Sequence, residues 1–320
     1  MRMKRRTYLA TAMAALAVTA TACGSDSGGG GGGGGKAEIG MSISTLNNPF
    51  FVEMKKGAEA EAKAQKVDLS VTDAQNDAST QTNQLQNFTS QNKNVIIINP
   101  VDSKAAAPSV KAAGNADIPV VAADRAVEGA DVTTTVASNN VQGGELAAKA
   151  LAEQIGKEGQ IVVLRGISGT SASNERFQGF EKGIKKYPDI KVVAKQPAEF
   201  DRTKGLDVMT NLLQSNPGIS GVFAENDEMA LGAVKALGSR AGDSVQVVGF
   251  DGTPDGLKAV RKGTMATTIA QQPDETRQDG RTERGAGGGR HERRQGHQGA
   301  GEGRRQGQRG GLPEVSAARF

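Results

Sequence analysis

The sequence predicts an α/β protein made of two doubly wound lobes with parallel sheets. Short apolar runs alternate with helix-like segments between residues 36 and 272. Such a β-α-β-α order requires parallel strands joined by right-handed crossovers. Several runs are continuous in Val and Ile, as in strands that helices cover on both faces. This region of roughly 240 residues holds eight or more strands, too many for one open sheet, so two lobes are expected.

Eight apolar runs are the predicted strands, and the helix patterns lie between them. The chain near Ala137–Asn140 is the predicted first crossing between the lobes, and Asn48 with Pro49 forms a suitable start for the first helix. The runs are AEIGMSIS (37–44), NVIIINP (94–100), IPVVAAD (118–124), QIVVLRG (160–166), KVVAKQ (191–196), GVFAEND (221–227), VQVVGFD (245–251) and MATTIAQQ (265–272), with helices such as FFVEMKKGAEAEAKAQ (50–65), LAAKALAEQI (146–155) and DEMALGAVKAL (227–237).

The composition excludes several kinds of site. The single cysteine, Cys23, rules out an intrachain disulfide and a Cys/His metal cluster. Both histidines, His291 and His297, lie in the tail, so a catalytic Ser/His/Asp or Cys/His arrangement is not expected. The net charge of +4 is small and Arg is concentrated in the tail. We therefore expect no enzyme, no cofactor, no metal and no nucleic-acid partner.

The N-terminus reads as a targeting segment. Residues 1–23 have a basic start, an apolar run from about Leu9 to Val18 and small residues leading to Cys23. This pattern predicts a secretory signal peptide, too short to remain as a membrane span. Cys23 lies where bacterial lipoproteins carry the lipidated cysteine, although Ala20 stands where Leu is commoner. A Gly-rich tether (24–36) follows, which favours lipid anchoring at the outer face of the cell membrane over an ordinary signal peptide with an incidental cysteine.

Polar and aromatic residues follow the predicted strands. In open α/β sheets ligands bind beyond the carboxyl ends of the strands, so these residues are the candidate site. Four of the nine Phe residues are among them, in a chain with only 3% aromatic residues. In chain order the candidates are Asn48, Phe50, Phe51, Asn99, Asp124, Arg125, Arg176, Phe200, Asn226, Phe250, Asp251 and Gln271.

The chemistry of this set suits a neutral polar ring. Asp accepts hydrogen bonds from hydroxyls, Arg donates through a planar fork, and Asn and Gln do both. Aromatic rings cover the C–H faces of a sugar. No paired carboxylates, metal cluster or histidine base stand out at these positions, so the site is expected to hold its ligand without transforming it.

Each candidate also has a simpler interpretation. Asn48 serves equally well as an N-cap and Asn99 as a turn residue before Pro100. Asp124 and Arg125 could be a surface ion pair. The four Phe residues could be core, and Arg176, Asn226, Asp251 and Gln271 are unremarkable singly. Only their joint placement after successive strands favours a shared site.

Several long motifs closely resemble bacterial periplasmic ribose-binding proteins of the type I sugar-binding family. They are STLNNPFF, INPVDS, ADRAV, GISGTSASNERFQGF, PAEFDRTKGLDVMTNLL, FAENDEMALGA, VVGFDGTPDG and ATTIAQQPD, which occur in order between about Ala37 and Asp274. The resemblance implies two Rossmann-like lobes (37–138 and 139–270) and a return to a three-stranded hinge (271–274). It also implies ribose contacts at all twelve candidates, closure about the hinge, a monomer, and delivery to an ABC transporter permease.

Rival functions differ in the features they require. A binder of another monosaccharide, of the allose or galactose type, is the nearest alternative. A sugar-sensing transcription repressor would need an N-terminal helix-turn-helix, where this chain has the targeting segment. A glycoside hydrolase would need a suitably spaced carboxylate pair, and none is evident from the sequence.

The tail (275–320) departs from the rest of the chain. Its Arg/Gly-rich stretch after Pro273 lacks Lys and any aliphatic side chain larger than Ala, so it cannot bury a core. Codons for RQDGR (277–281), read one base later, can encode Gly-Lys-Thr-Gly-Val, and those for 295–308 can encode a Val-alternating strand like the family's last one. We therefore predict a frameshift between about Pro273 and Arg277, either in the gene or as a sequencing error. The alternative is a genuine tail that binds nucleic acid or anionic surfaces, and resequencing the gene tests the choice.

Overall fold

The computed structural model describes residues 36–271 and 317–318. The predicted signal peptide with Cys23, the tether as far as residue 35, residues 272–274 and nearly all of the tail, including the predicted frameshift, lie outside the described residues. No helix in the described part of the chain has the length and hydropathy that a membrane crossing needs.

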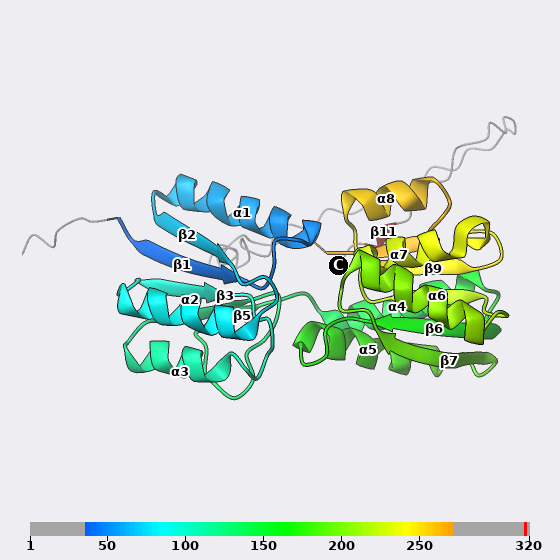
Figure 1. Cartoon of the computed structure of the whole chain (residues 1–320), viewed down its shortest axis with the longest axis horizontal. Coiled ribbons are helices and arrows are strands. Elements are labelled where there is room, and N and C mark those ends of the chain that lie inside the picture. The colour runs from blue at the N-terminus through cyan, green and yellow to red at the C-terminus, as the bar shows by residue number, and fades with distance from the viewer. Residues whose placement is uncertain (1–35, 272–316, 319–320) are drawn as a thin grey trace, which may run out of the picture. The chain divides into compact units, whose positions relative to one another are not determined.

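The first lobe is built on a five-stranded sheet (Figure 1). Its order is β2-β1-β3-β4-β5, and every pairing in it is parallel. Because parallel strands share one carboxyl edge, the residues after β1, β3 and β4 meet at that edge. The strands are β1 (Glu38–Ile43), β2 (Asp68–Asp73), β3 (Val95–Ile98), β4 (Val120–Ala123) and β5 (Thr134–Val136).

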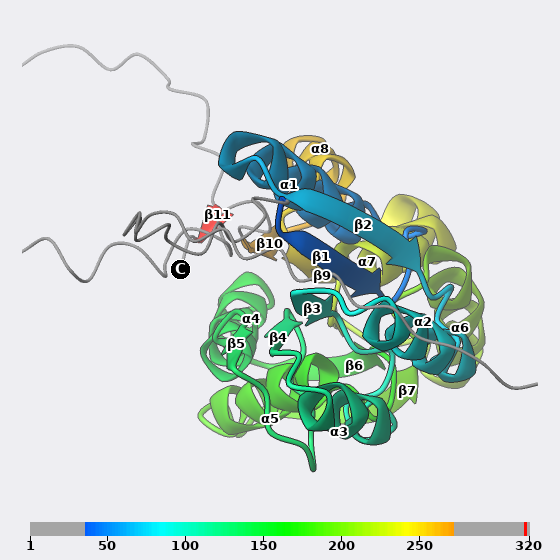
Figure 2. The same ribbon diagram turned by 90° about the vertical axis from the view of Figure 1, so that its left-hand side faces the viewer.

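Helices cover both faces of the first sheet. Helix α1 (Pro49–Gln65) lies on one face, and α2 (Ala78–Ser90) and α3 (Ala107–Asn115) lie on the other (Figure 2). Met41 and Ile43 of β1 pack against α1, whereas Ile96 and Ile98 of β3 pack against α2 and α3. This burial on both faces explains the continuous apolar runs of the sequence.

The second lobe is built on a six-stranded parallel sheet. Its order is β11-β10-β9-β8-β6-β7. Strand β11 (Ala317–Ala318) pairs with β10, so the described end of the tail adds an edge strand to this sheet. The other strands are β6 (Gly159–Arg165), β7 (Ile190–Pro197), β8 (Gly221–Ala224), β9 (Gln246–Asp251) and β10 (Thr267–Ala270).

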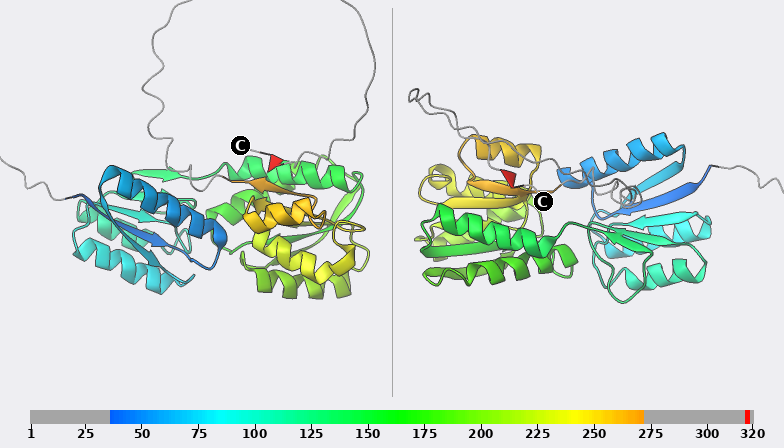
Figure 3. Two further views of the ribbon diagram at one scale, coloured as in Figure 1. Left: turned by 90° about the horizontal axis from the view of Figure 1, so that it is seen from above. Right: turned by 180° about the vertical axis from the view of Figure 1, so that it is seen from behind.

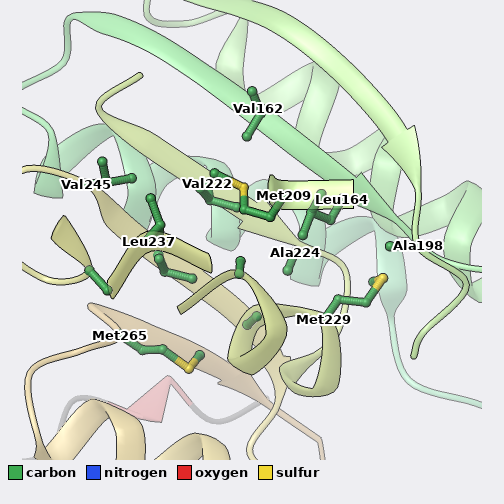
Figure 4. Packing of buried hydrophobic residues seen from close by; sticks show 14 of the residues in the cluster. Val162, Leu164, Ala198, Met209, Val222, Ala224, Met229, Leu237, Val245 and Met265 are labelled. Atoms are coloured by element: carbon green, nitrogen blue, oxygen red, sulfur yellow. The ribbon is translucent and has the colours of Figure 1, made fainter. Parts of the chain in front are cut away.

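Two hydrophobic layers sandwich the second sheet. The helices are α4 (Asn140–Gln154), α5 (Ser171–Ile184), α6 (Arg202–Ser215), α7 (Asp227–Leu237) and α8 (Pro254–Arg261). Ile161 and Val163 of β6 face α4 and α5, while Val162 and Leu164 pack with Met209 of α6 and its neighbours (Figure 4). Seen from above, the green helix α4 and the gold helix α8 lie on opposite sides of the orange strand β10 (Figure 3).

This architecture confirms the predicted fold class of two doubly wound parallel-sheet lobes. All eight predicted strands are present. Three strands were not predicted from the sequence: β2 and β5, which are the two edge strands of the first sheet, and β11. The strands of the first sheet all lie within residues 38–136, but the lobe boundary at 138/139 stays a prediction.

Candidate functional site

The loop after β1 brings three candidate residues to the carboxyl edge of the first sheet. Asn48 is the N-cap of α1, and its Oδ1 accepts a hydrogen bond from the Phe50 amide at 2.9 Å. Pro49 then begins the helix with its fixed φ. The rings of Phe50 and Phe51 meet edge to face, with centroids 5.3 Å apart. Asn48 is thus an N-cap, which was the simpler of its two predicted roles. It also lines the pocket described below.

Asp124 and Arg125 follow β4 and are buried, so their interpretation as a surface pair is wrong. Asp124 has a φ of 65°, in the left-handed region. The Asn99 side chain donates to the Ala123 carbonyl at 3.0 Å and to Asp124 Oδ2 at 3.5 Å. Asn99 therefore fixes the end of β4 through its side-chain amide. Its Oδ1 accepts hydrogen bonds from the hydroxyl and the amide of Ser44.

Arg125 is held between aromatic rings with one donor unused. Its guanidinium carbon lies 5.2 Å from the ring centroid of Phe51 and 5.6 Å from that of Phe200, which belongs to the other lobe. Its Nη1 donates to the Pro100 carbonyl at 2.9 Å. Within the described part of the chain, its buried Nε has no hydrogen-bond partner. A buried donor without a partner costs roughly 1–3 kcal/mol, so a ligand acceptor at this point is favoured.

Arg176 projects from α5 and is fixed on every side. Its Nε donates to Asn140 Oδ1 at 2.9 Å and its Nη1 to the Glu225 carbonyl at 2.7 Å. Nη1 also lies 3.6 Å from Asp251 Oδ1. The guanidinium carbon stacks 4.0 Å from the ring centroid of Phe250. The direction of this side chain is therefore set before any ligand arrives.

Close helix packing positions Arg176 as well. Gly144 of α4 and Gly179 of α5 lie in the contact between these two helices. A Cβ on Gly144 would come 2.0 Å from the Arg176 carbonyl oxygen, and one on Gly179 would come 2.0 Å from that of Val141. Only glycine permits α4 and α5 to approach so closely. The position of Arg176 on α5 therefore depends on Gly144 and Gly179.

Phe200 and Asn226 follow β7 and β8. The Asn226 amide donates to the Phe200 carbonyl at 3.1 Å, and its Oδ1 caps α7 by accepting from the Met229 amide at 2.9 Å. Phe200 has a φ of 59°, and its ring covers Gly166, where a Cβ would lie 2.0 Å from Cζ. A left-handed non-glycine residue of this kind stores on the order of 1–3 kcal/mol of strain and is typical of functional sites.

Asp251 and Gln271 link the second lobe to the predicted crossing. The Gln271 amide donates to Asp251 Oδ1 at 2.7 Å, and its Oε1 accepts from the Ser138 hydroxyl at 2.7 Å. Asp251 has a φ of 120°, far from the usual region for a residue with a side chain. Gln271 thus connects the segment between the lobes directly to a carboxylate of the site.

These residues meet in one pocket, which is lined by side chains from both lobes. Ten of the twelve candidates line it, together with Ala172, which the sequence reading missed because a small apolar residue carries no chemical signal. Asn99 and Phe250 do not line it; they touch Asp124 and Arg176 from behind. The lining residues are Asn48, Phe50, Phe51, Asp124, Arg125, Ala172, Arg176, Phe200, Asn226, Asp251 and Gln271.

The two lobes touch each other beside the pocket. The Ser103 amide donates to the Gly169 carbonyl at 3.1 Å, and the Ser171 amide donates to the Ser103 hydroxyl at 3.1 Å. The Ala126 amide donates to the Ser171 hydroxyl at 2.9 Å. Groups of both lobes therefore line the same pocket.

The charges of the pocket balance. It contains the carboxylates of Asp124 and Asp251 and the guanidinium groups of Arg125 and Arg176. Burial raises the pKa of both carboxyls, against the lowering effect of the arginines, and burial lowers the pKa of Arg125 to about 10. Each carboxylate lies beside a guanidinium group, Asp124 beside Arg125 and Asp251 beside Arg176. Two opposite pairs suit an uncharged ligand.

The described residues contain no cluster of His, Cys, Asp and Glu suited to a metal ion. The side-chain donors of the pocket are amide and guanidinium groups, and the acceptors are carboxylate and amide oxygens. This combination recognises hydroxyl groups, which donate and accept at once.

Residues 39–279 match the periplasmic binding protein domain family. The chain is 48% identical over 240 residues to the ribose import binding protein of Salmonella typhimurium, covering 75% of this chain and 81% of the relative. It is 48% identical over 236 residues to the ribose import binding protein of Bacillus subtilis, covering 74% and 76%.

A solved structure of a periplasmic solute-binding protein is also similar to this chain. It is an ABC transporter periplasmic solute-binding protein from Actinobacillus succinogenes with bound D-allose. The TM-score is 0.71 at 37% identity, and the match covers 75% of this chain and 87% of the other. The chain belongs to the periplasmic binding protein family and is a type I sugar-binding member of it.

Proposed function

We propose that this protein captures ribose outside the cytoplasm and delivers it to an ABC importer. The observation that carries the proposal is a pocket in which both lobes present groups suited to a sugar. Asp124 and Asp251 accept from hydroxyls, Arg125 and Arg176 donate to oxygens, and the rings of Phe51 and Phe200 cover the apolar faces.

Capture follows from the division of these groups between the lobes. The first lobe supplies Asn48 through Arg125, and the second supplies Arg176 through Asp251. Neither half satisfies all the hydroxyls of a sugar, so the ligand binds the closed arrangement more tightly than any open one. Binding then shifts the population toward closure, which a permease can recognise.

The finer features belong to the same proposal. The protein acts as a monomer with lobes 37–138 and 139–270 and a return segment at 271–274, and lipidated Cys23 anchors it to the outer face of the membrane. It has no catalytic role, so we expect ribose to be recovered unchanged after incubation. Similarity to two ribose import binding proteins supports ribose as the ligand.

A sugar panel measured by thermal unfolding tests the choice of ligand. At a given concentration, a ligand that binds only the folded state raises Tm more the more tightly it binds. We expect D-ribose to raise Tm more than D-allose or D-galactose at equal concentration, and Asp124→Ala to remove the rise. A larger shift with a hexose would favour the allose-type alternative, which the solved allose-bound relative makes the second candidate. No shift with any sugar would refute the proposal.

A further inference from the structure

The loop that follows β9 holds the pocket carboxylate Asp251 in an unusual backbone conformation. Asp251 has a φ of 120° and Gly252 a φ of 75°. A residue with a side chain does not stay at such a φ unless its surroundings hold it there. Asp251 is 5% exposed, and its Oδ1 is within reach of both Gln271 and Arg176. Any shift of this backbone would therefore move the carboxylate out of the pocket wall.

Three hydrogen bonds from Gly252 and Thr253 hold this loop, and all of them lead to Asp227, one through Thr268. The Gly252 amide donates to the Thr268 hydroxyl at 3.2 Å, and that hydroxyl donates to Asp227 Oδ1 at 2.6 Å. The Thr253 amide and hydroxyl donate to Asp227 Oδ2 at 2.7 and 2.9 Å. The Asp227 carboxylate thus links the two residues that follow Asp251 to the neighbouring strand β10.

The space around the Asp227 carboxylate is shaped for it. A Cβ on Gly249 would lie 2.4 Å from Oδ1, and one on Gly256 would lie 2.2 Å from Oδ2. Asp227 has no exposed surface, and burial raises its pKa to about 6. Asp227 also lies in the first turn of α7, where the helix dipole favours an acidic side chain. The hydrogen bonds that its carboxylate accepts, however, come from Thr253 and from Thr268 of β10.

We propose that Asp227, acting through Thr268 and Thr253, is the positioning residue that holds Asp251 ready for the sugar before binding. Asp227 itself does not line the pocket. The inference rests on the proposed function, because it concerns the binding of ribose by Asp251. It goes beyond that function by assigning a role to a residue that touches no ligand.

Substitutions at Thr268 separate positioning from general stability. Thr268→Val keeps the shape of the side chain and removes the hydroxyl between Gly252 and Asp227, whereas Thr268→Ser keeps that hydroxyl. Titration calorimetry of the full chain with D-ribose should show about tenfold weaker binding for Thr268→Val, equivalent to about 1.4 kcal/mol. Thr268→Ser should bind within about threefold of the unmodified protein.

A core variant in the other lobe is the matched control. Val110 is buried between α2 and α3, so Val110→Ala should lower Tm and leave the Kd for ribose unchanged. If Thr268 served only stability, Thr268→Val would behave like Val110→Ala, with a lower Tm and an unaltered Kd for ribose. That result, or equal losses of affinity for Thr268→Val and Thr268→Ser, would overturn the inference.

Amide hydrogen exchange on the unmodified, sugar-free protein provides a test that needs no variant. We expect the amides of Gly252 and Thr253 to exchange slowly before ribose is added. Ribose binding with rapid exchange at both amides would overturn the positioning role alone. Slow exchange without any ribose binding would instead overturn the proposed function and leave the geometry of the Asp227 cluster standing.

Discussion

At the level of single residues, the pocket balances two buried carboxylates against two buried guanidinium groups. Arg176 lies 3.6 Å from Asp251, and Arg125 lies 3.7 Å from Asp124. Each charge has an opposite partner at close range, but Arg125 Nε has no hydrogen-bond partner among the residues that the structure describes. The site is therefore organised in advance and still able to form new hydrogen bonds.

Removing one member of this set should abolish ribose binding. Asp124→Ala and Arg176→Ala each leave an opposite charge buried without its partner, at a cost of about 3–5 kcal/mol, and also delete a sugar contact. We expect titration calorimetry to show affinity reduced by more than about 100-fold. Lys182→Ala, an exposed change on the same helix as Arg176, should have no effect. Near-normal affinity in both pocket variants would refute the site assignment.

Ribose affinity should fall as the solution is acidified. Burial raises the pKa of Asp124 and Asp251 above the ordinary value of 3.8. Sugar hydroxyls donate to the ionised form, so binding lowers these pKa values again and releases protons. Calorimetric titrations in two buffers with different heats of ionisation should detect proton release in the acidic range where these two carboxyls titrate. Tighter binding at acid pH would contradict this assignment of acceptors.

Much of the site could be predicted from the sequence at this level. Parallel sheets gather the residues that follow their strands, which explains why ten candidates line one pocket. Asn99 and Phe250 also follow strands, but they stand one layer behind the wall. The position of a residue in the sequence places it near the carboxyl edge of a sheet. It does not determine whether its side chain points into the pocket or packs behind a lining residue.

At the level of elements, the depth of the pocket depends on how closely α4 and α5 approach. Gly144→Ala would place a Cβ 2.0 Å from the Arg176 carbonyl oxygen and force the helices apart. We expect a loss of about 1–3 kcal/mol in the free energy of unfolding, together with weaker ribose binding, measured by denaturant titration and calorimetry.

A helical glycine in the first lobe is the control for that change. Gly114 lies in α3, and a Cβ there would meet nothing within 4 Å. Gly114→Ala should leave binding unaltered and stabilise the protein by up to about 1 kcal/mol through helix propensity. If Gly144→Ala proved as harmless, the close helix contact would not govern the site.

The strands that the sequence reading missed share a physical cause. β2 reads DLSVTD and carries no fully buried residue, and β5 is only three residues long with two exposed threonines. Strands were predicted from continuous apolar runs, which mark strands that are covered on both faces. β2 and β5 are the two edges of the first sheet, where half-covered strands need few apolar residues.

At the level of the whole molecule, buried acids should make the sugar-free protein less stable as pH rises. Burial raises the pKa of Asp227 to about 6 and also raises that of Glu225. A folded-state pKa above the unfolded one means that the folded state binds more protons, so stability falls between about pH 4 and 6 and then levels off. Asp227 alone accounts for up to about 3 kcal/mol.

Thermal unfolding checks this sign. The sugar-free protein should have a higher Tm at about pH 5 than at about pH 7.5, and Asp227→Asn should reduce the difference because it removes one titrating group. The exposed carboxyls of Asp77 and Glu145 have lowered pKa values and act in the opposite sense, but from solvent-exposed positions. A Tm that rises steadily from pH 5 to 7.5 would show that the buried acids do not dominate.

The two-lobe architecture could be predicted from chain length and strand number, because one open sheet would hold too many strands. The contact between the lobes could not be predicted from local patterns. It depends on single hydrogen bonds between distant residues, such as that from the Ala126 amide to the Ser171 hydroxyl. The lipid anchor, the lobe boundaries and the frameshift stay predictions.

A crystal structure of the full chain saturated with D-ribose would test the central claim most directly. We predict one ribose per chain, enclosed between the lobes, with hydroxyls on Asp124 and Asp251 and a sugar oxygen accepting from Arg125 Nε. Ribose bound elsewhere, or a pocket that stays unchanged at saturating sugar, would contradict the account.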